Sequence, residues 1–164
     1  RKANGKSATP TTTKNNLKWD TRKVQDGTYH VRVLASDRMA NPNQAKEDTI
    51  VLRPIIVDNS EPIVLINQRT GLTKLPTSIR CFDKTSYISS AEYRIDNNEW
   101  FAATCEDQIF DNHYETIIID EGNIIKNGKY TLHLRVRDAA GNEKTEKLEY
   151  GLPSGNSTED TTTR

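Results

Sequence analysis

The stretch "YTLHLRVRDAAGN", residues 130–142, decides the fold of this chain. Apolar residues occupy every second position from Tyr130 to Val136, and polar or charged residues stand between them. Alternation with a period of two is typical of a strand with one buried face and one wet face. The stretch ends in Asp138, three further residues and Asn142, and Asp and Asn are turn residues. It therefore predicts an antiparallel strand followed by a tight return.

The same phrase occurs earlier in the chain, as "YHVRVLASDRMAN" at residues 29–41. The two copies align without a gap at a constant offset, because 130 − 29 and 142 − 41 both equal 101. A unit of about 100 residues is too long for a solenoid repeat and has the size of one immunoglobulin-like sandwich. The chain is therefore predicted to hold two copies of one module. The matched positions with a predicted structural role are Tyr29, Asp37, Asn41, Tyr130, Asp138 and Asn142.

Seven short strands account for the second copy, which we place at residues 59–152. Each strand is bounded by Asp, Asn, Gly or Pro, and no segment keeps a helical period. The predicted strands are 63–67, 78–82, 87–96, 99–103, 115–120, 129–138 and 144–152. Asn97 and Asn98 predict a type I′ hairpin turn, and Trp100 is expected to pack across the core. The predicted fold class is all-β, an antiparallel β-sandwich of the immunoglobulin or fibronectin type III kind.

The first copy is incomplete, because the counterpart of Pro62 would lie at 62 − 101 = −39, ahead of Arg1. Residues 1–58 are expected to be the C-terminal part of a first module. Its predicted strands are 17–21, 28–37 and 48–58. Three strands cannot close a sandwich, so part of their apolar face is expected to remain uncovered.

The two copies meet at "VDNSEP", residues 57–62, a joint that contains no glycine. A short joint of this kind predicts a semi-rigid pair of modules. Residues 153–164 are rich in Ser and Thr and have no apolar spacing, so they are predicted to form a disordered tail.

Charge and motif content argue against several classes of function. The chain has 23 Lys and Arg against 23 Asp and Glu, so no net field attracts nucleic acid or an anionic membrane. No apolar run approaches the roughly 20 residues that a membrane-spanning helix needs. The sequence contains no G-x-S-x-G motif, its glycine–lysine stretches lack phosphate-loop spacing, and its three histidines lack metal-ligand spacing. We therefore expect no enzymatic activity and no cofactor.

Acidic residues near the joint and at the strand ends allow two interpretations. The favoured one is local: Asp and Asn side chains accept hydrogen bonds from turn backbone. The alternative is calcium, which takes six to eight hard oxygen ligands, with Asn41 and Asp83 as further donors. The calcium candidates are Asp37, Asp58, Asn59, Glu61 and Asp138. Cys81 is predicted to be a small buried hydrophobe, and a disulfide with Cys105 is the alternative.

The chain resembles the tandem fibronectin type III-like or immunoglobulin-like repeats of large secreted bacterial proteins. The resemblance covers roughly residues 17–151. It rests on "WDTRKVQDGTYHVRVLASDRMANPN" with "VDNSEP", and on "AEYRIDNNEWFAATCEDQIFDN" with "NGKYTLHLRVRDAAGN". Similar modules lie near the C-terminus of secreted, often β-propeller-bearing proteins and in cell-surface adhesins. The family has no catalytic motif, so the resemblance implies a fold and transfers no functional residue.

The expected function is that of a non-catalytic spacer or docking scaffold in an extracellular, cell-surface or periplasmic protein. The expected partners are other domains of the same parent chain and a protein or glycan at the cell surface. Three alternatives remain at this point: a carbohydrate-binding module that uses an exposed Trp100, a calcium-supported adhesion module, and an accessory domain of a secreted enzyme.

Overall fold

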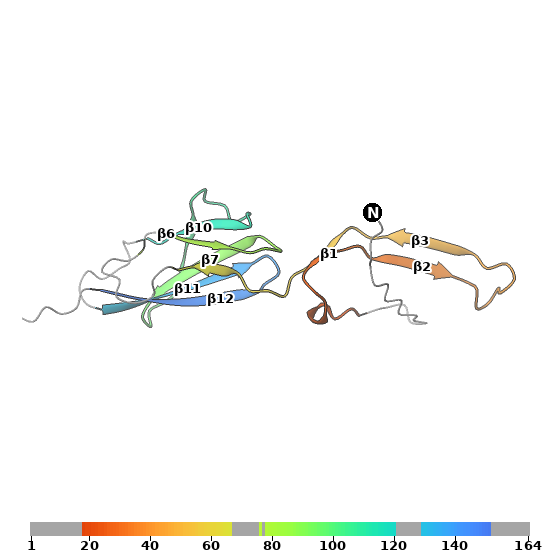
Figure 1. The fold of residues 1–164 in the computed structure, drawn as a ribbon, viewed down its shortest axis with the longest axis horizontal. Helices are drawn as coiled ribbons and strands as arrows, with labels where there is room; N and C mark the ends of the chain where they lie inside the picture. The colour runs from red at the N-terminus through yellow and green to blue at the C-terminus, as the bar shows by residue number, and fades with distance from the viewer. Residues whose placement is uncertain (1–17, 67–75, 77, 121–128, 152–164) are drawn as a thin grey trace, which may run out of the picture.

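A computed structural model describes residues 18–66, 76, 78–120 and 129–151 of the chain. An extended two-stranded ribbon is followed, end to end, by a β-sandwich (Figure 1). Apart from one 3-10 turn, η1 (Thr21–Lys23), all regular elements in this part of the chain are strands. The all-β prediction is confirmed. The predicted tail at 153–164 lies outside the described residues.

The sandwich consists of two antiparallel four-stranded sheets. One sheet has the order β5 (Ile63–Leu65), β6 (Ser78–Phe82), β10 (Tyr114–Ile118) and β9 (Thr104–Cys105). The other has the order β12 (Glu143–Gly151), β11 (Lys129–Asp138), β7 (Ile88–Ile95) and β8 (Phe101–Ala102). Each of the seven predicted segments overlaps a strand. The two-residue strand β9 was missed because it is too short to show a period.

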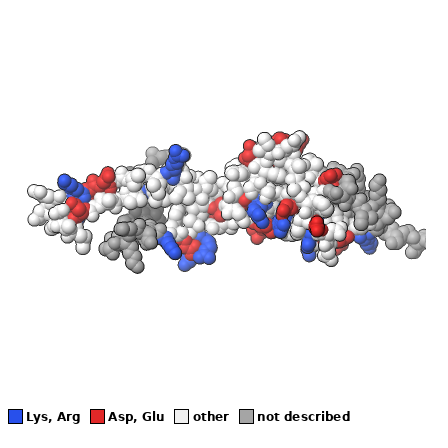
Figure 2. Space-filling model, turned by 180° about the vertical axis from the view of Figure 1, so that it is seen from behind, with Lys and Arg blue, Asp and Glu red and all other residues white. Residues whose placement is uncertain are grey.

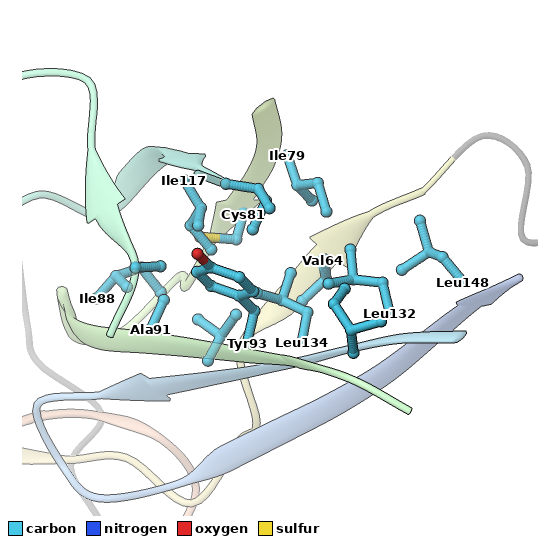
Figure 3. Packing of buried hydrophobic residues seen from close by; sticks show 14 of the residues in the cluster. Val64, Ile79, Cys81, Ile88, Ala91, Tyr93, Ile117, Leu132, Leu134 and Leu148 are labelled. Carbon is cyan, nitrogen blue, oxygen red and sulfur yellow. The ribbon is translucent and has the colours of Figure 1, made fainter. Parts of the chain in front are cut away.

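The core lies between these two sheets and follows from the alternation in the sequence. Leu132, Leu134 and Val136 of β11 point inward and are fully buried. Figure 3 shows the inward side chains of β7 and β11 facing those of Ile79, Cys81 and Ile117 from the opposite sheet. Each buried aliphatic side chain of this size stabilises the fold by about 1.5–3 kcal/mol.

The ribbon is a single long hairpin. Strand β2 (Arg32–Ser36) pairs with β3 (Glu47–Val51), and β1 (Gly27–Tyr29) pairs with β4 (Ile55–Val57). Arg32 faces Val51 and Tyr29 faces Ile55, so the returning strand carries one extra residue between the two ladders. Pro54 lies in this bulge, where the missing N–H breaks no ladder bond.

The strand predicted at 17–21 is wrong over its described part. Lys18–Asp20 have no regular structure, and the chain then forms η1. Asp20 explains the difference, because its carboxylate accepts a hydrogen bond from the backbone N–H of Arg22 at 3.3 Å and caps the turn. The indole of Trp19 packs edge-on against Tyr29, with ring centroids 5.5 Å apart.

The turn predicted at Asn97–Asn98 is also different. A type I′ turn needs positive φ at both central residues, and among the described residues here only Asp96 has it, with φ 52°. The carboxylate of Asp96 accepts from the N–H of Thr131 at 2.8 Å, and its own N–H donates to the Thr131 carbonyl at 2.7 Å. These two bonds to β11 fix the left-handed residue at Asp96.

Trp100 does not lie in the core, which corrects the packing expected from its hairpin position. Its neighbour Phe101 pairs with the buried Tyr93, so Trp100 faces the outer surface of the sheet. There the guanidinium groups of Arg94 and Arg135 lie 4.8 and 4.2 Å from the centre of the indole ring. Both distances fit cation–π contacts, which hold Trp100 on the solvent-exposed face of the sheet.

Candidate functional site

The joint between ribbon and sandwich is held by a network of polar contacts, and Asp26 binds it on the ribbon side. The Asp26 carboxylate accepts from the backbone N–H of Asn59 at 2.8 Å, from the Asn59 side-chain amide at 3.0 Å and from the Ser60 hydroxyl. The Asn59 amide also donates to the carbonyls of Thr21 and Val24. The bonds from Ser60 and Asn59 lower the pKa of Asp26.

Asp58 and Glu61 fasten the same segment to the sandwich. The Asp58 carboxylate accepts from the Ser86 hydroxyl, and its backbone carbonyl accepts from the side-chain amide of Asn142 at 3.2 Å. Glu61 forms an ion pair with Lys144 at 3.0 Å. The joint is therefore tied to both structural units by side chains only one to three residues apart.

Three carboxylates meet where the joint enters the sandwich. One oxygen each of Asp58, Asp83 and Asp138 lies within 4.8 Å of the others. Asp83 and Asp138 are almost fully buried, with 3 % and 1 % of their surfaces exposed. Asp83 accepts from the N–H groups of Thr85 and Ser86, and Asp138 accepts from the backbone and side-chain amide of Asn142. Both buried acids therefore hold turns together.

This crowding has an electrostatic consequence for Asp58. Burial, and then the negative charges of Asp83 and Asp138, raise the pKa of Asp58 although Ser86 and Ser60 donate hydrogen bonds to it. The ionised joint therefore contains a repulsion that a proton or another cation would relieve.

The five calcium candidates do not converge on one point. Asp58 and Asp138 meet, together with Asp83. Asn59 binds Asp26, Glu61 pairs with Lys144, and Asp37 lies at the tip of the ribbon. Calcium takes six to eight oxygens, and the three clustered carboxylates already accept hydrogen bonds from turns. The favoured turn assignment accounts for the observed bonds, and calcium stays an alternative prediction.

The repeated Asp-x-x-x-Asn phrase forms the same contact in both copies. The side-chain amide of Asn41 donates to Asp37 at 2.8 Å, and that of Asn142 donates to Asp138 at 2.9 Å. The loops that follow differ. Gly141, with φ 92°, allows the second copy to turn within residues 138–142, whereas the first copy uses residues 37–46.

Tyr29 and Tyr130, at the starts of the two repeated strands, make different contacts with the described residues. The hydroxyl of Tyr29 donates to the backbone carbonyl of Gln25, four residues upstream. The segment at the same place ahead of Tyr130 lies outside the described residues. The ring of Tyr130 packs against Tyr150 at a centroid distance of 5.8 Å.

Cys81 and Cys105 are buried free thiols. Strand β10 lies between the strands that carry them, and two strand spacings amount to about 9.6 Å. A disulfide needs Cα atoms about 4.4–6.8 Å apart, so these two cysteines do not meet its geometry. Burial raises the pKa of Cys81 to about 12 and that of Cys105 to about 11, so both thiols are protonated and inert at neutral pH.

Sequence reasoning missed three contributors to the joint: Asp26, Ser60 and Ser86. Asp26 stands directly before the glycine that opens β1, and nothing in its local pattern shows that it will meet residues more than thirty positions later. The one available signal was its place directly before the repeated strand, where the second copy has Asn127 ahead of Gly128.

No family model matches this chain, and no curated protein matches it. Within the described residues, no helix has the length and apolar character needed to cross a membrane.

Proposed function

We propose that this chain is a non-catalytic spacer or docking scaffold of a larger extracytoplasmic protein. The observation that carries the proposal is the joint, where Asn59 and Ser60 bind the ribbon through Asp26 while Asp58 binds the sandwich through Ser86 and Asn142. A segment held from both sides transmits orientation as well as distance. This is the property that a scaffold needs in order to present neighbouring domains at a set geometry.

The strand order supports an immunoglobulin or fibronectin type III kind of module. One sheet has the order β5-β6-β10-β9 and the other β12-β11-β7-β8. With β5 as strand A, these correspond to A-B-E-D and G-F-C-C′, the two sheets of immunoglobulin-type sandwiches. On the same scheme the ribbon corresponds to the F–G hairpin of a preceding module. The hydroxyl contact of Tyr29 fits the tyrosine corner at the start of strand F.

The distance between the two ends of the molecule tests this proposal. Met39 at the ribbon tip is 99 % exposed, and Asn98 lies in an exposed turn at the other end. Spin labels are attached to cysteines introduced as Met39→Cys and Asn98→Cys, while the buried native thiols stay unlabelled. Double electron–electron resonance then gives the distribution of distances between the two labels. We expect one narrow distribution, which Asp26→Ala broadens and which the ribbon control Asp48→Ala leaves unchanged. A broad distribution for the labelled parent would contradict a semi-rigid scaffold.

The rival functions receive less support from the described contacts. A sugar-stacking role needs a free aromatic face, and the guanidinium groups of Arg94 and Arg135 lie over the Trp100 ring. On a glycan array, the unaltered chain and its Trp100→Ala variant should give the same binding signals if Trp100 contributes only to packing. An accessory role for an enzyme would appear as a change in the parent protein's substrate affinity when this segment is deleted.

A further inference from the structure

One edge of the ribbon has no neighbour within the described residues. Strand β2 pairs with β3 along one side only, and the two form a two-stranded sheet. The backbone N–H and C=O groups along the other side of β2 are therefore open to a further strand. An isolated two-stranded hairpin is marginally stable in water, so this open edge is also where the ribbon gains most from a partner.

The surface beside this edge is apolar. Val33 and Ile50 face each other across the ribbon and remain 48 % and 60 % exposed, and Leu34 and Val51 on the opposite face are exposed as well. On the face drawn in Figure 2, charged side chains lie near the tip of the ribbon and toward the joint, with mostly uncharged surface between them. Exposed apolar side chains on both faces of a two-stranded ribbon are typical of a surface that a partner covers.

The second copy shows what covers the equivalent edge. The offset of 101 places Val33 at the position of Leu134 and Ala35 at the position of Val136. In the sandwich Leu134 faces Tyr93 and Val136 faces Ala91, both on β7, which runs antiparallel to β11. A strand on the edge of β2 should therefore run antiparallel and place apolar residues opposite Val33 and Ala35.

The charge of Arg32 sets a further requirement for a strand that pairs with β2, and a strand with the sequence of β7 does not meet it. Arg32 takes the position of His133, whose partner across the ladder is Arg94. A strand with a basic residue there would place two positive charges directly opposite each other. The neighbouring row shows the favourable case, since Arg135 forms an ion pair with Glu92 across the same two strands. The strand that fits β2 therefore carries Asp or Glu opposite Arg32.

We propose that the open edge of β2 accepts an extended, antiparallel strand of a partner polypeptide, apolar opposite Val33 and Ala35 and acidic opposite Arg32. This inference rests on the proposed scaffold function and specifies its docking surface.

Two peptides test the edge on the intact chain. The first has the sequence of residues 87–96, and the second is the same peptide with Arg94→Glu. We expect the second to bind about three- to tenfold more tightly, because it replaces a like-charge pair with an opposite-charge pair. Binding should shift the backbone amide resonances of residues 32–36. The chain variant Arg32→Glu should reverse the preference, and Val33→Lys should abolish binding of both peptides.

Several outcomes would overturn the inference. If the peptides instead shift the amide resonances of residues 47–51, the strand that accepts them is β3. Equal affinities for the two peptides would show that Arg32 does not select the partner. Sedimentation that shows a dimer of the chain, lost in Leu34→Lys, would make a second copy the occupant. None of these results changes the distance distribution that tests the scaffold.

Discussion

The two hairpins of this chain carry one sequence phrase and have opposite surroundings. In the sandwich, Leu134 of β11 is fully buried between two sheets, whereas its counterpart Val33 in the ribbon is 48 % exposed. The strand pairing and the Asp–Asn contact at the turn occur in both. Local pattern thus determines strand and turn, while burial by the remaining strands decides how much each residue contributes to stability.

The largest expected contrast concerns the side chains that face the core. Leu134→Ala should lower the free energy of unfolding by about 2–5 kcal/mol, because it removes buried methyl groups and leaves a cavity. Val33→Ala, at the matched position of the ribbon, should change it by less than about 0.5 kcal/mol. Urea unfolding followed by circular dichroism measures both. Similar losses for the two variants would mean that the ribbon has a covered core of its own.

The repeated turn gives the next contrast. Asp138→Ala leaves the backbone and side-chain amides of Asn142 without their buried acceptor and should cost about 1–3 kcal/mol. Asp37→Ala removes the same contact at the exposed tip, where water replaces it, so the sandwich should melt at an unchanged temperature. Differential scanning calorimetry compares the two. A loss of equal size at Asp37 would show that ribbon and sandwich unfold together.

The joint gives a smaller, pH-dependent difference. The pKa of Asp58 is raised in the folded state above its ordinary value of 3.8, so the folded chain binds this proton more tightly than the unfolded chain does. The associated stability is fully present below pH 3.8 and is lost as pH rises through the raised folded value. Asp58→Asn removes the charge. The free energy of unfolding of this variant, relative to that of the unaltered chain, should therefore increase as pH rises from 3.8 through the raised pKa of Asp58.

Thermal melts of parent and Asp58→Asn across this pH range provide the measurement, with the exposed Asp48→Asn as the control. A difference that is constant with pH would mean that the substitution acts through lost hydrogen bonds with Ser60 and Ser86 instead of through charge.

The smallest effect is expected from calcium. The clustered carboxylates of the joint accept hydrogen bonds from turns, so we expect the melting temperature of the chain to be the same in excess calcium and in chelator. A higher temperature with calcium, lost in Asp83→Asn, would instead assign a cation site to Asp58, Asp83 and Asp138 and would favour the adhesive alternative.

The sequence predicted most of the strands because their alternation is local. Residues 129–138 were predicted with the observed bounds, since every second residue there faces the core. The turn at Asp96 could not be predicted in the same way, because it depends on Thr131, thirty-five positions later. Trp100 was placed in the core because it starts the return strand of the predicted hairpin, and its actual position follows from the register that sets Phe101 opposite Tyr93.

The candidate site was predictable only in part, for a related reason. Asp58, Asn59 and Glu61 were recognised as oxygen-bearing residues in the joint, and Asp138 from the repeated Asp-x-x-x-Asn ending. Their partners were not, since Asp26 and Ser86 reach the joint through the path of the chain. A residue type shows what a side chain is able to bind, and the tertiary structure decides which partner it meets.

The bonds between Asp26 and Asn59 have a mechanical consequence. Gly27 and Val57, the first and last paired residues of the ribbon, face each other directly beside this contact. Tension that enters the chain ahead of Asp26 and leaves it after Asn59 therefore crosses through the Asp26 contact and bypasses the hairpin. The ribbon is a side arm that carries no force while this contact holds. When it breaks, the ladder from Gly27 opens pair by pair and the chain lengthens by the extended length of residues 27–57.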